Sequence, residues 1–243
     1  MESLILYKPP FEKKRVGKNN DGGYVIIELP DTYDAFISGG IDNDISFEEH
    51  FLNLHESLIC YAFDGSILNL PHHNNRIRFY KKNLGEFNNN ELTNLHEYIE
   101  PYNDIFMKID IEGHEFKFMP TLIEKNLMIK IKQLVIEIHS SADIQLYPDY
   151  FKGLSDIDND DKMFDLFKNF NKTHTLVHFH ANNGCKLQQI DGIDLPHVFE
   201  LTYIRNDYVS EKIKNIEPLP TALDMKNSLS KPDYILKGFP YSL

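Results

Sequence analysis

The stretch Ile105-Phe106-Met107-Lys108-Ile109-Asp110-Ile111-Glu112-Gly113-His114-Glu115 decides the fold, because it joins a short apolar run to a dense group of charges. A continuous apolar run of this length is typical of a strand buried on both faces of a parallel sheet. Lys108 and Asp110 would share one strand face, since side chains alternate along a strand. A lysine in a buried strand needs a partner for its charge.

Similar apolar runs recur along the chain and alternate with helical patterns. We expect strands at residues 24–27, 35–37, 58–63, 76–80, 105–109, 131–138, 175–180 and 198–204. We expect helices at 46–54, 91–99, 115–125 and 163–170, and Pro120 should bend the third helix or mark its start. Apart from the strand at 24–27, the alternation predicts a Rossmann-like α/β fold with a seven-stranded, mostly parallel sheet and helices on both faces. No helix fits between the last two strands, so they should form an antiparallel hairpin.

Composition and charge narrow the function classes. The chain has 243 residues and a formal net charge of -12, which argues against binding to nucleic acid or an anionic membrane. No apolar stretch approaches the ~20 residues of a membrane span. Residues 1–10 lack the pattern of a signal peptide, and two cysteines form no disulfide framework, so we expect a cytoplasmic protein.

The organisation we expect is a single domain spanning residues 1–243. An N-terminal extension, 1–33, would hold a turn and a strand. The Rossmann-like core would span 34–205, and a tail would follow at 206–243. A homodimer is compatible with this sequence.

Ligands of open α/β sheets bind beyond the carboxyl ends of the strands, and the sequence places chemically useful residues there. The first strand is followed by Gly39 and Gly40, then by Asp42 and Asp44. Asp64 ends the second strand, where an acid can accept both hydroxyls of a ribose. The glycine loop lacks the Gly-x-Gly-x-x-Gly pattern of a pyrophosphate cradle.

Three further strand ends carry ionisable side chains. Asp110 ends the fourth strand, Glu137 and His139 share one face of the fifth, and His180 ends the sixth. A histidine titrates near neutral pH and can act as a general base. A second interpretation of the same residues is a divalent cation, Mg²⁺ or Mn²⁺, held by Asp110 and His139.

Five blocks in chain order resemble FkbM-like methyltransferases. They are Arg15–Val25, Gly40–Glu48 followed by Tyr61–Asp64, Met107–Glu115, His180–Gly184 and Glu200–Tyr203. The resemblance implies a seven-stranded, S-adenosylmethionine-dependent methyltransferase that acts on a hydroxyl of a sugar or glycan.

The resemblance also implies roles for individual residues. Residues 39–44 would line the methionine end of the cofactor, Asp64 would hold its ribose, and Asp110 would lie beside the sulfonium. For catalysis we expect His139, Asp110 and Glu137. The acceptor site should be formed by the loops 140–162 and 182–197, with His180, Asn182 and Tyr147 as substrate contacts.

Two other classes of function remain open from the sequence. A nicotinamide-dependent oxidoreductase shares the sheet and the ribose acid, although it needs a better glycine fingerprint. A catalytically silent interaction protein would use the same fold without turnover. Asp156, Asp158, Asp160 and Asp161 lack the central glycine and terminal glutamate of a calcium loop, so we interpret them as a solvated acidic turn.

Overall fold

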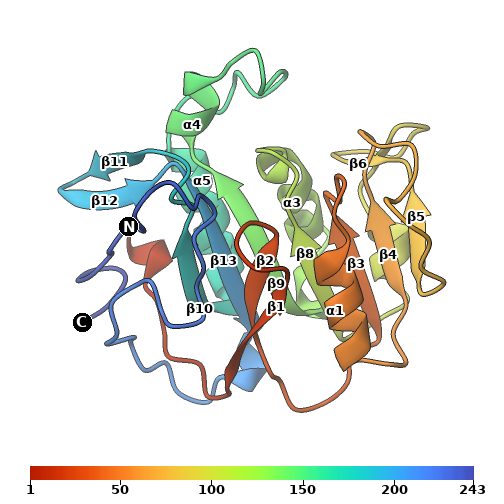
Figure 1. The fold of residues 1–243 in the computed structure, drawn as a ribbon, viewed down its shortest axis with the longest axis horizontal. Helices are drawn as coiled ribbons and strands as arrows, with labels where there is room; N and C mark the ends of the chain where they lie inside the picture. The colour runs from red at the N-terminus through yellow and green to blue at the C-terminus, as the bar shows by residue number, and fades with distance from the viewer.

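The computed structural model describes residues 1–243 and is organised around one seven-stranded sheet (Figure 1). Its strand order is β10-β13-β9-β8-β3-β4-β5. The bounds are β3 Ala35–Gly39, β4 Cys60–Phe63, β5 Ile77–Tyr80, β8 Ile105–Ile109, β9 Ile131–His139, β10 His174–Ala181 and β13 Val198–Arg205. Only β13 runs antiparallel to its neighbours β9 and β10. The predicted mostly parallel sheet and its closing hairpin are therefore confirmed.

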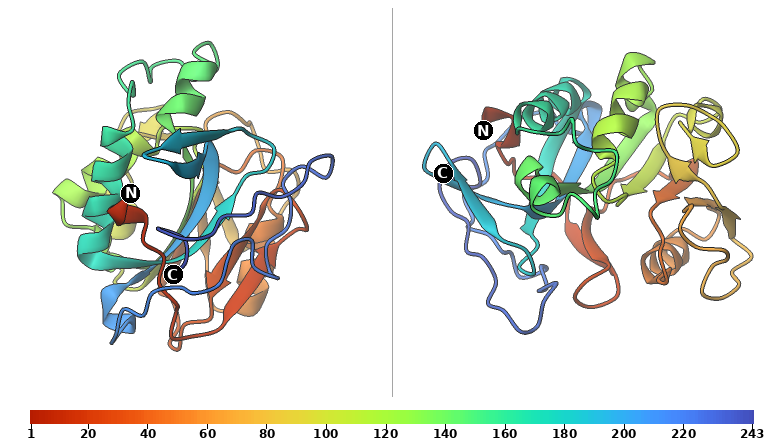
Figure 2. Two further views of the ribbon diagram at one scale, coloured as in Figure 1. Left: turned by 90° about the vertical axis from the view of Figure 1, so that its left-hand side faces the viewer. Right: turned by 90° about the horizontal axis from the view of Figure 1, so that it is seen from above.

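Helices cover both faces of the sheet, as the sequence predicts. Helices α3 (Glu115–Glu124) and α5 (Asp161–Thr173) lie on one face. Helix α1 (Ser46–Leu54) lies on the other, together with the N-terminal hairpin and the C-terminal tail (Figure 2). All residues of β3, β8 and β9 are buried, which explains their continuous apolar runs.

The strand order locates a topological switch point. From β3 the chain proceeds to β4 and β5 on one side of the sheet, and later to β8 and β9 on the other. Strand β3 pairs in parallel with both β4 and β8. The carboxyl ends of these strands thus meet at one edge, where open α/β sheets bind ligands.

The N-terminal extension is a hairpin of β1 (Lys13–Gly17) and β2 (Gly23–Ile27) laid over the sheet. Every residue of β2 is buried. The side chain of Gln133 on β9 accepts a hydrogen bond from Ile27 N at 2.6 Å and donates to Ile27 O at 3.0 Å. The tail, residues 206–243, begins with a short 3-10 turn, Asn206–Tyr208, and packs on the same face, where Tyr241 is buried.

Several local expectations were wrong. Residues 91–99 are not one helix. They contain the short strand β7 (Leu92–Thr93), which pairs with β6 (Asn83–Leu84), and a single turn, α2 (His96–Ile99). Asparagine side chains cause the break, because Asn89 Oδ1 accepts from the backbone N–H of Leu92 and Asn94 Oδ1 from that of His96.

The expected loops also contain regular structure. Helix α4 (Ser141–Leu146) lies within 140–162, and Ser140 caps its first turn. A small hairpin, β11 (Leu187–Ile190) with β12 (Ile193–Pro196), lies within 182–197. Pro120 lies inside α3 without marking its start. Two 3-10 turns complete the structure, at Glu2–Leu4 and Met128–Lys130.

The longest helix, α5, has 13 residues. None of the helices combines the length and the apolar character needed to cross a bilayer.

Candidate active site

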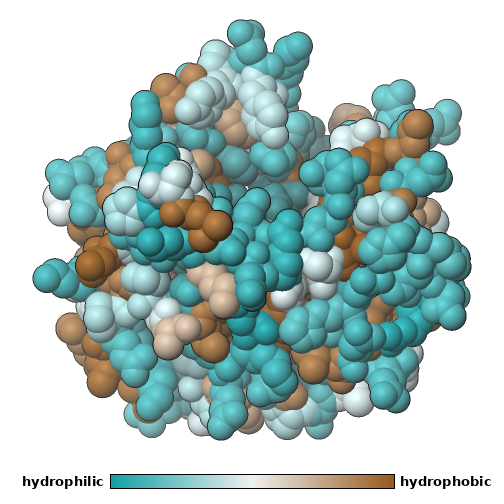
Figure 3. All heavy atoms as spheres, viewed as in Figure 1, coloured by the Kyte–Doolittle hydropathy of each residue, from teal (hydrophilic) through white to brown (hydrophobic).

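Two adjoining cavities open at the carboxyl ends of β3, β4 and β8, with volumes of about 450 and 270 Å³. They share five lining residues: Gly40, Asp64, Ser66, Asp110 and Glu112. Together they form one trough, which we call the switch-point trough. The face in Figure 3 is mostly hydrophilic and is hollowed at its upper edge, between the segments that Figure 1 labels α4 and β6.

The two glycines after β3 are required by the packing of the protein itself. Gly40 has φ +80°, and a Cβ there would lie 1.6 Å from the carbonyl oxygen of Asp110. A Cβ on Gly39 would lie 2.5 Å from Leu84 Cδ1. Gly40 therefore lets β3 and β8 end close together, and Gly39 lets Leu84 pack against the end of β3. Of the two, only Gly40 lines the trough.

Asp64 is at the predicted strand end, but its carboxylate is already used. Oδ2 accepts from the backbone N–H of Ile41 at 2.8 Å and of Asp42 at 2.9 Å, and Oδ1 accepts from both N–H and O–H of Ser66. These hydrogen bonds hold the pKa of Asp64 low despite its burial. Asp64 thus shapes the loop, and a ribose hydroxyl would have to displace one of these donors.

Lys108 lies on the buried strand β8 and finds the partners that its charge requires. Its ammonium donates to Gly40 O at 2.7 Å and lies 5.6 Å from the ring centre of Tyr24. The Tyr24 hydroxyl donates to Asp110 Oδ2 at 2.8 Å. Glu48 of α1 accepts from the Ser38 hydroxyl at 2.6 Å, and burial raises its pKa while Lys108 opposes that rise.

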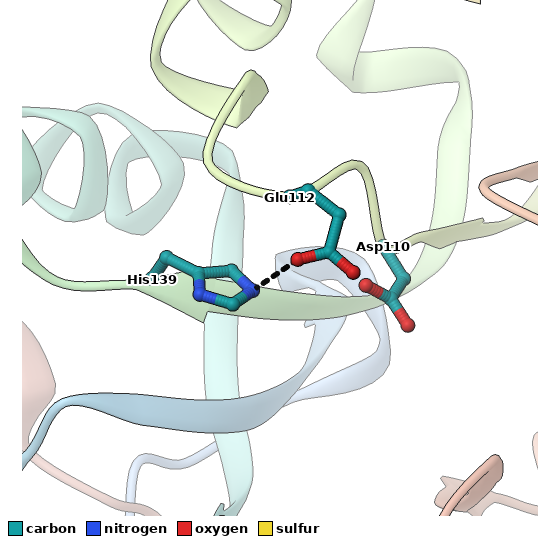
Figure 4. Close-up of side chains that lie close together, drawn as sticks. All are labelled: Asp110, Glu112 and His139. Carbon is teal, nitrogen blue, oxygen red and sulfur yellow. Dashed lines mark ion pairs between the residues drawn. The ribbon is translucent and has the colours of Figure 1, made fainter. Parts of the chain in front are cut away.

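His139 at the end of β9 lies between two carboxylates. Its Nδ1 is 2.9 Å from Asp143 Oδ2, and its Nε2 is 3.2 Å from Glu112 Oε2. Figure 4 shows the imidazole directed toward Glu112, with Asp110 beside that carboxylate. The ligand atoms of Asp110, Glu112 and His139 all lie within 4.8 Å of one another. The structure thus brings together two residues expected from the sequence, and adds Glu112.

These surroundings determine the protonation of His139. Burial lowers the pKa of the imidazole, but the hydrogen-bonded carboxylates of Asp143 and Glu112 outweigh burial and raise it to about 11. The free side chain therefore keeps its proton at neutral pH, which is the wrong state for the general base we expected.

Two neighbouring carboxyls have the opposite environment. Burial raises the pKa of Asp110, and it raises the pKa of Glu137 well above its usual value, with the nearby Asp110 charge adding to the effect. A carboxylate with a raised pKa is the better proton acceptor near neutral pH.

Of the other predicted residues, Asp42 and Asp44 line the trough, whereas His180 and Asn182 line neither cavity. Asp44 pairs with Lys18 at 2.8 Å and accepts from Ser46 N at the start of α1. Asp42, with φ +46°, lines the larger cavity. His180 is buried against Glu200 at 3.3 Å, and Asn182 accepts from Gly184 N in its own turn.

Tyr147 is 53% exposed and lines neither cavity, whereas Tyr150 lines the larger one. Tyr147 directly follows α4, and Tyr150 is the tyrosine of this segment that lines the trough.

Two residues of the site were missed from the sequence. Glu112 belongs to the charged block at residues 108–115, but it follows the strand, where side chains no longer alternate predictably. Its backbone has φ +55°, and this conformation sets the direction of the side chain. Asp143 is four residues beyond His139. This spacing would have predicted their contact only if a helical turn had been expected after His139. Both residues hold the imidazole in place.

No protein-family model matches the chain, and no curated protein matches it. The FkbM resemblance therefore depends on the sequence motifs alone. Among solved structures, a Pnkp1/Rnl/Hen1 complex aligns at 13% identity with a TM-score of 0.40, covering 73% of this chain but only 39% of that chain.

The plantazolicin methyltransferase BpumL in complex with SAH aligns at 11% identity with a TM-score of 0.33, covering 72% of this chain and 76% of that chain. Its complex with SAH and a monoazolic desmethylPZN analog gives 10% identity and a TM-score of 0.34, covering 72% and 76%. These likenesses are distant, and the function must be argued from the site.

Proposed function

We propose that this protein is an S-adenosylmethionine-dependent methyltransferase that methylates a hydroxyl group of a sugar or glycan. The observation that carries the proposal is the charge of the trough. Its larger cavity is lined by seven acidic side chains and two lysines: Asp21, Asp42, Asp44, Glu48, Asp64, Asp110 and Glu112 against Lys18 and Lys108. An acidic trough at a switch point favours a cationic ligand such as a sulfonium.

The same charge argues against a dinucleotide. A pyrophosphate binds where free backbone N–H groups at a helix N-terminus meet it. Here the first turn of α1 carries Glu48 and Glu49, and Gly40 is fixed by its contact with Asp110. The nicotinamide-dependent oxidoreductase is therefore the weaker candidate.

The smaller cavity fits the nucleoside part of the cofactor. Its walls include the apolar side chains of Phe63, Leu84, Leu92 and Ile111, which suit the flat face of an adenine. Asn83 also lines it, and its amide Nδ2 makes no hydrogen bond within the protein, while Oδ1 accepts from Gly65 N. With Asp64 saturated, Asn83 and Ser66 are the polar groups we assign to the ribose.

S-adenosylmethionine supplies a methyl group on a positively charged sulfur. The side chains of this protein must then hold the acceptor and take the proton of its hydroxyl. We assign the proton to Asp110 or Glu137, whose pKa values are raised. His139, held by Asp143 and Glu112, orients the acceptor, and Tyr150 offers a ring face to a sugar. Asp110 and His139, considered from the sequence as ligands of Mg²⁺ or Mn²⁺, lie beside a third potential ligand, Glu112.

The test begins with the cofactor. Isothermal titration of the purified protein with S-adenosylhomocysteine should show micromolar binding, and NADH titrated in parallel should show none. Binding of NADH alone, or of neither compound, would overturn the proposal, and the second result would favour a catalytically silent protein.

Turnover tests the assigned residues. Incubation with methyl-labelled S-adenosylmethionine and a panel of sugar acceptors should transfer label to product. Asp110→Ala should reduce the rate at least 100-fold, a typical effect of removing a general base. The roles given to Asp110 and His139 are wrong if Asp110→Ala and His139→Ala both retain full turnover with normal cofactor affinity.

A further inference from the structure

Three potential metal ligands converge at the edge of the switch-point trough. Asp110 directly follows β8, Glu112 lies two residues later, and His139 ends the adjacent strand β9. One ligand atom from each lies within 4.8 Å of the other two. Figure 4 shows the two carboxylates and the imidazole turned toward a common space.

The spacing of these atoms suits a divalent cation. Two ligands at right angles, each about 2.1 Å from an ion, lie about 3.0 Å apart. The distance from His139 Nε2 to Glu112 Oε2 is 3.2 Å. Two carboxylates with one imidazole favour Mg²⁺ or Mn²⁺ over a metal that prefers sulfur ligands. Three protein ligands leave coordination positions free for water or a substrate oxygen.

The histidine is oriented as a ligand would be. Asp143 is buried, and its Oδ2 lies 2.9 Å from Nδ1 of the imidazole. A carboxylate on the far nitrogen keeps the proton on Nδ1 when a cation displaces the proton on Nε2, as at most metal-bound histidines. The N-terminal turn of α4, capped by Ser140, holds Asp143 in this position.

An independent observation is the state of Glu137. It is 8% exposed, and its register partner on β13 is another buried acid, Glu200. Glu137 lies two residues before His139 on β9. Ile109 of β8 pairs with Ile136 of β9, so the residues that follow them, Asp110 and Glu137, lie side by side. Acids gathered in a buried place are costly to ionise together unless a cation lies beside them, and these acids adjoin the three ligands.

We propose that Asp110, Glu112 and His139 bind one divalent cation, Mn²⁺ or Mg²⁺, with Asp143 orienting the histidine. The cation's free positions face the trough, where they bind the acceptor hydroxyl and lower its pKa. With Asp110 acting as a ligand, the proton is assigned to Glu137. This last role rests on the proposed methyl transfer, whereas cation binding does not.

The cation alone is the probe. After EDTA treatment and removal of the chelator, the full chain should bind one Mn²⁺ per molecule, measured by electron paramagnetic resonance of free Mn²⁺. Electron spin-echo spectra of the complex should show coupling to an imidazole nitrogen, and His139→Ala should remove it. Glu112→Gln should weaken binding more than 10-fold, and Asp143→Asn by about 10- to 100-fold.

Asp158→Asn is the matched control, because Asp158 lies in the exposed acidic turn and should leave Mn²⁺ binding unchanged. Thermal unfolding of each variant confirms that it is folded. The proposal fails if no Mn²⁺ binds at 1 mM, or if bound Mn²⁺ shows no nitrogen coupling and ignores both Glu112→Gln and His139→Ala. Mn²⁺ binding without binding of S-adenosylhomocysteine would retain the cation site and remove the methyltransferase; the converse would remove only the cation site.

Discussion

His139 and His178 are both buried beside a carboxylate, but one faces an open trough and the other is enclosed. His178 Nε2 lies 2.8 Å from Asp224 Oδ1, and Nδ1 lies 3.3 Å from the Lys13 ammonium. Burial lowers the pKa of His178. Burial alone would raise the pKa of Asp224, but the contact with His178 and the Thr221 N–H hold it low. A neutral imidazole therefore connects a cation to an anion, and no ring atom is left for a ligand.

His139 is not enclosed in this way. Its Nε2 partner, Glu112, is 53% exposed, and the carboxyls of Asp110 and Glu137 beside it carry raised pKa values. The enclosed pair is balanced in charge and ties the tail to the hairpin, so it should act on stability. The open cluster instead gathers four carboxyls around one imidazole, and carboxyls that are costly to ionise together are expected at a site that binds a cation.

The largest effect should come from the contact that holds the open region together. Gly40→Ala places a Cβ 1.6 Å from the Asp110 carbonyl at φ +80°. We expect a loss of about 5 kcal/mol or more of unfolding free energy, measured by urea denaturation, because backbone must move to relieve the overlap. Gly153→Ala is the control, since Gly153 has φ +83° with no atom within 4 Å. It should cost only about 1–2 kcal/mol, and equal losses in the two variants would show that the contact is unimportant.

Breaking the enclosed pair should have the next largest effect. Asp224→Ala leaves His178 and Lys13 buried without their anion and removes the acceptor of the Thr221 N–H. We expect a loss of about 4 kcal/mol in the urea-derived unfolding free energy at pH 7. Because the folded pKa of Asp224 is depressed, this contribution is present above its unfolded pKa, near 4, and is lost as the pH falls through the folded value.

The control is Asp165→Ala, which breaks the exposed pair with Lys168 and should change stability by less than about 0.5 kcal/mol.

Binding of S-adenosylhomocysteine should be unchanged in folded Asp224→Ala. Loss of that binding with stability intact would mean that the enclosed region belongs to the site, contrary to the comparison.

The sequence predicted the sheet better than it predicted the site. Six of the seven strands were found because each contains an apolar run that the sheet buries, and burial leaves a direct record in residue type. Strand β5 was found from its alternation of polar and apolar residues, which fits its partial exposure. The direction of Glu112 and the pairing of Asp143 with His139 left no such record, because they depend on a left-handed residue and a six-residue helix. The role of Asp224 was equally hidden, since it lies 46 residues from His178 and only the folded tail brings it there.

A smaller effect than that of Asp224→Ala should come from Glu115, which lies behind the open cluster in the first turn of α3. Its Oε1 accepts from Ile111 N at 2.8 Å, and Oε2 is buried without a partner. Burial raises the pKa of Glu115 from 4.5 to about 7. The folded protein therefore holds a proton that the unfolded chain has already lost between these values, so stability should fall as the pH rises from about 4.5 to 7. The decline between these pH values amounts to about 3 kcal/mol.

Glu115→Gln keeps the acceptor for Ile111 N and removes the ionisation. Urea unfolding at intervals from pH 5 to 8 should show a shallower decline in this variant than in the parent, with the two curves diverging most above pH 7. Glu124→Gln, at the exposed far end of the same helix, should follow the parent curve. Equal slopes of unfolding free energy against pH in Glu115→Gln and Glu124→Gln would show that Glu115 is not held in its uncharged form. The contrast between the acidic open region and the charge-balanced enclosed pair would then be limited to the residues that line the trough.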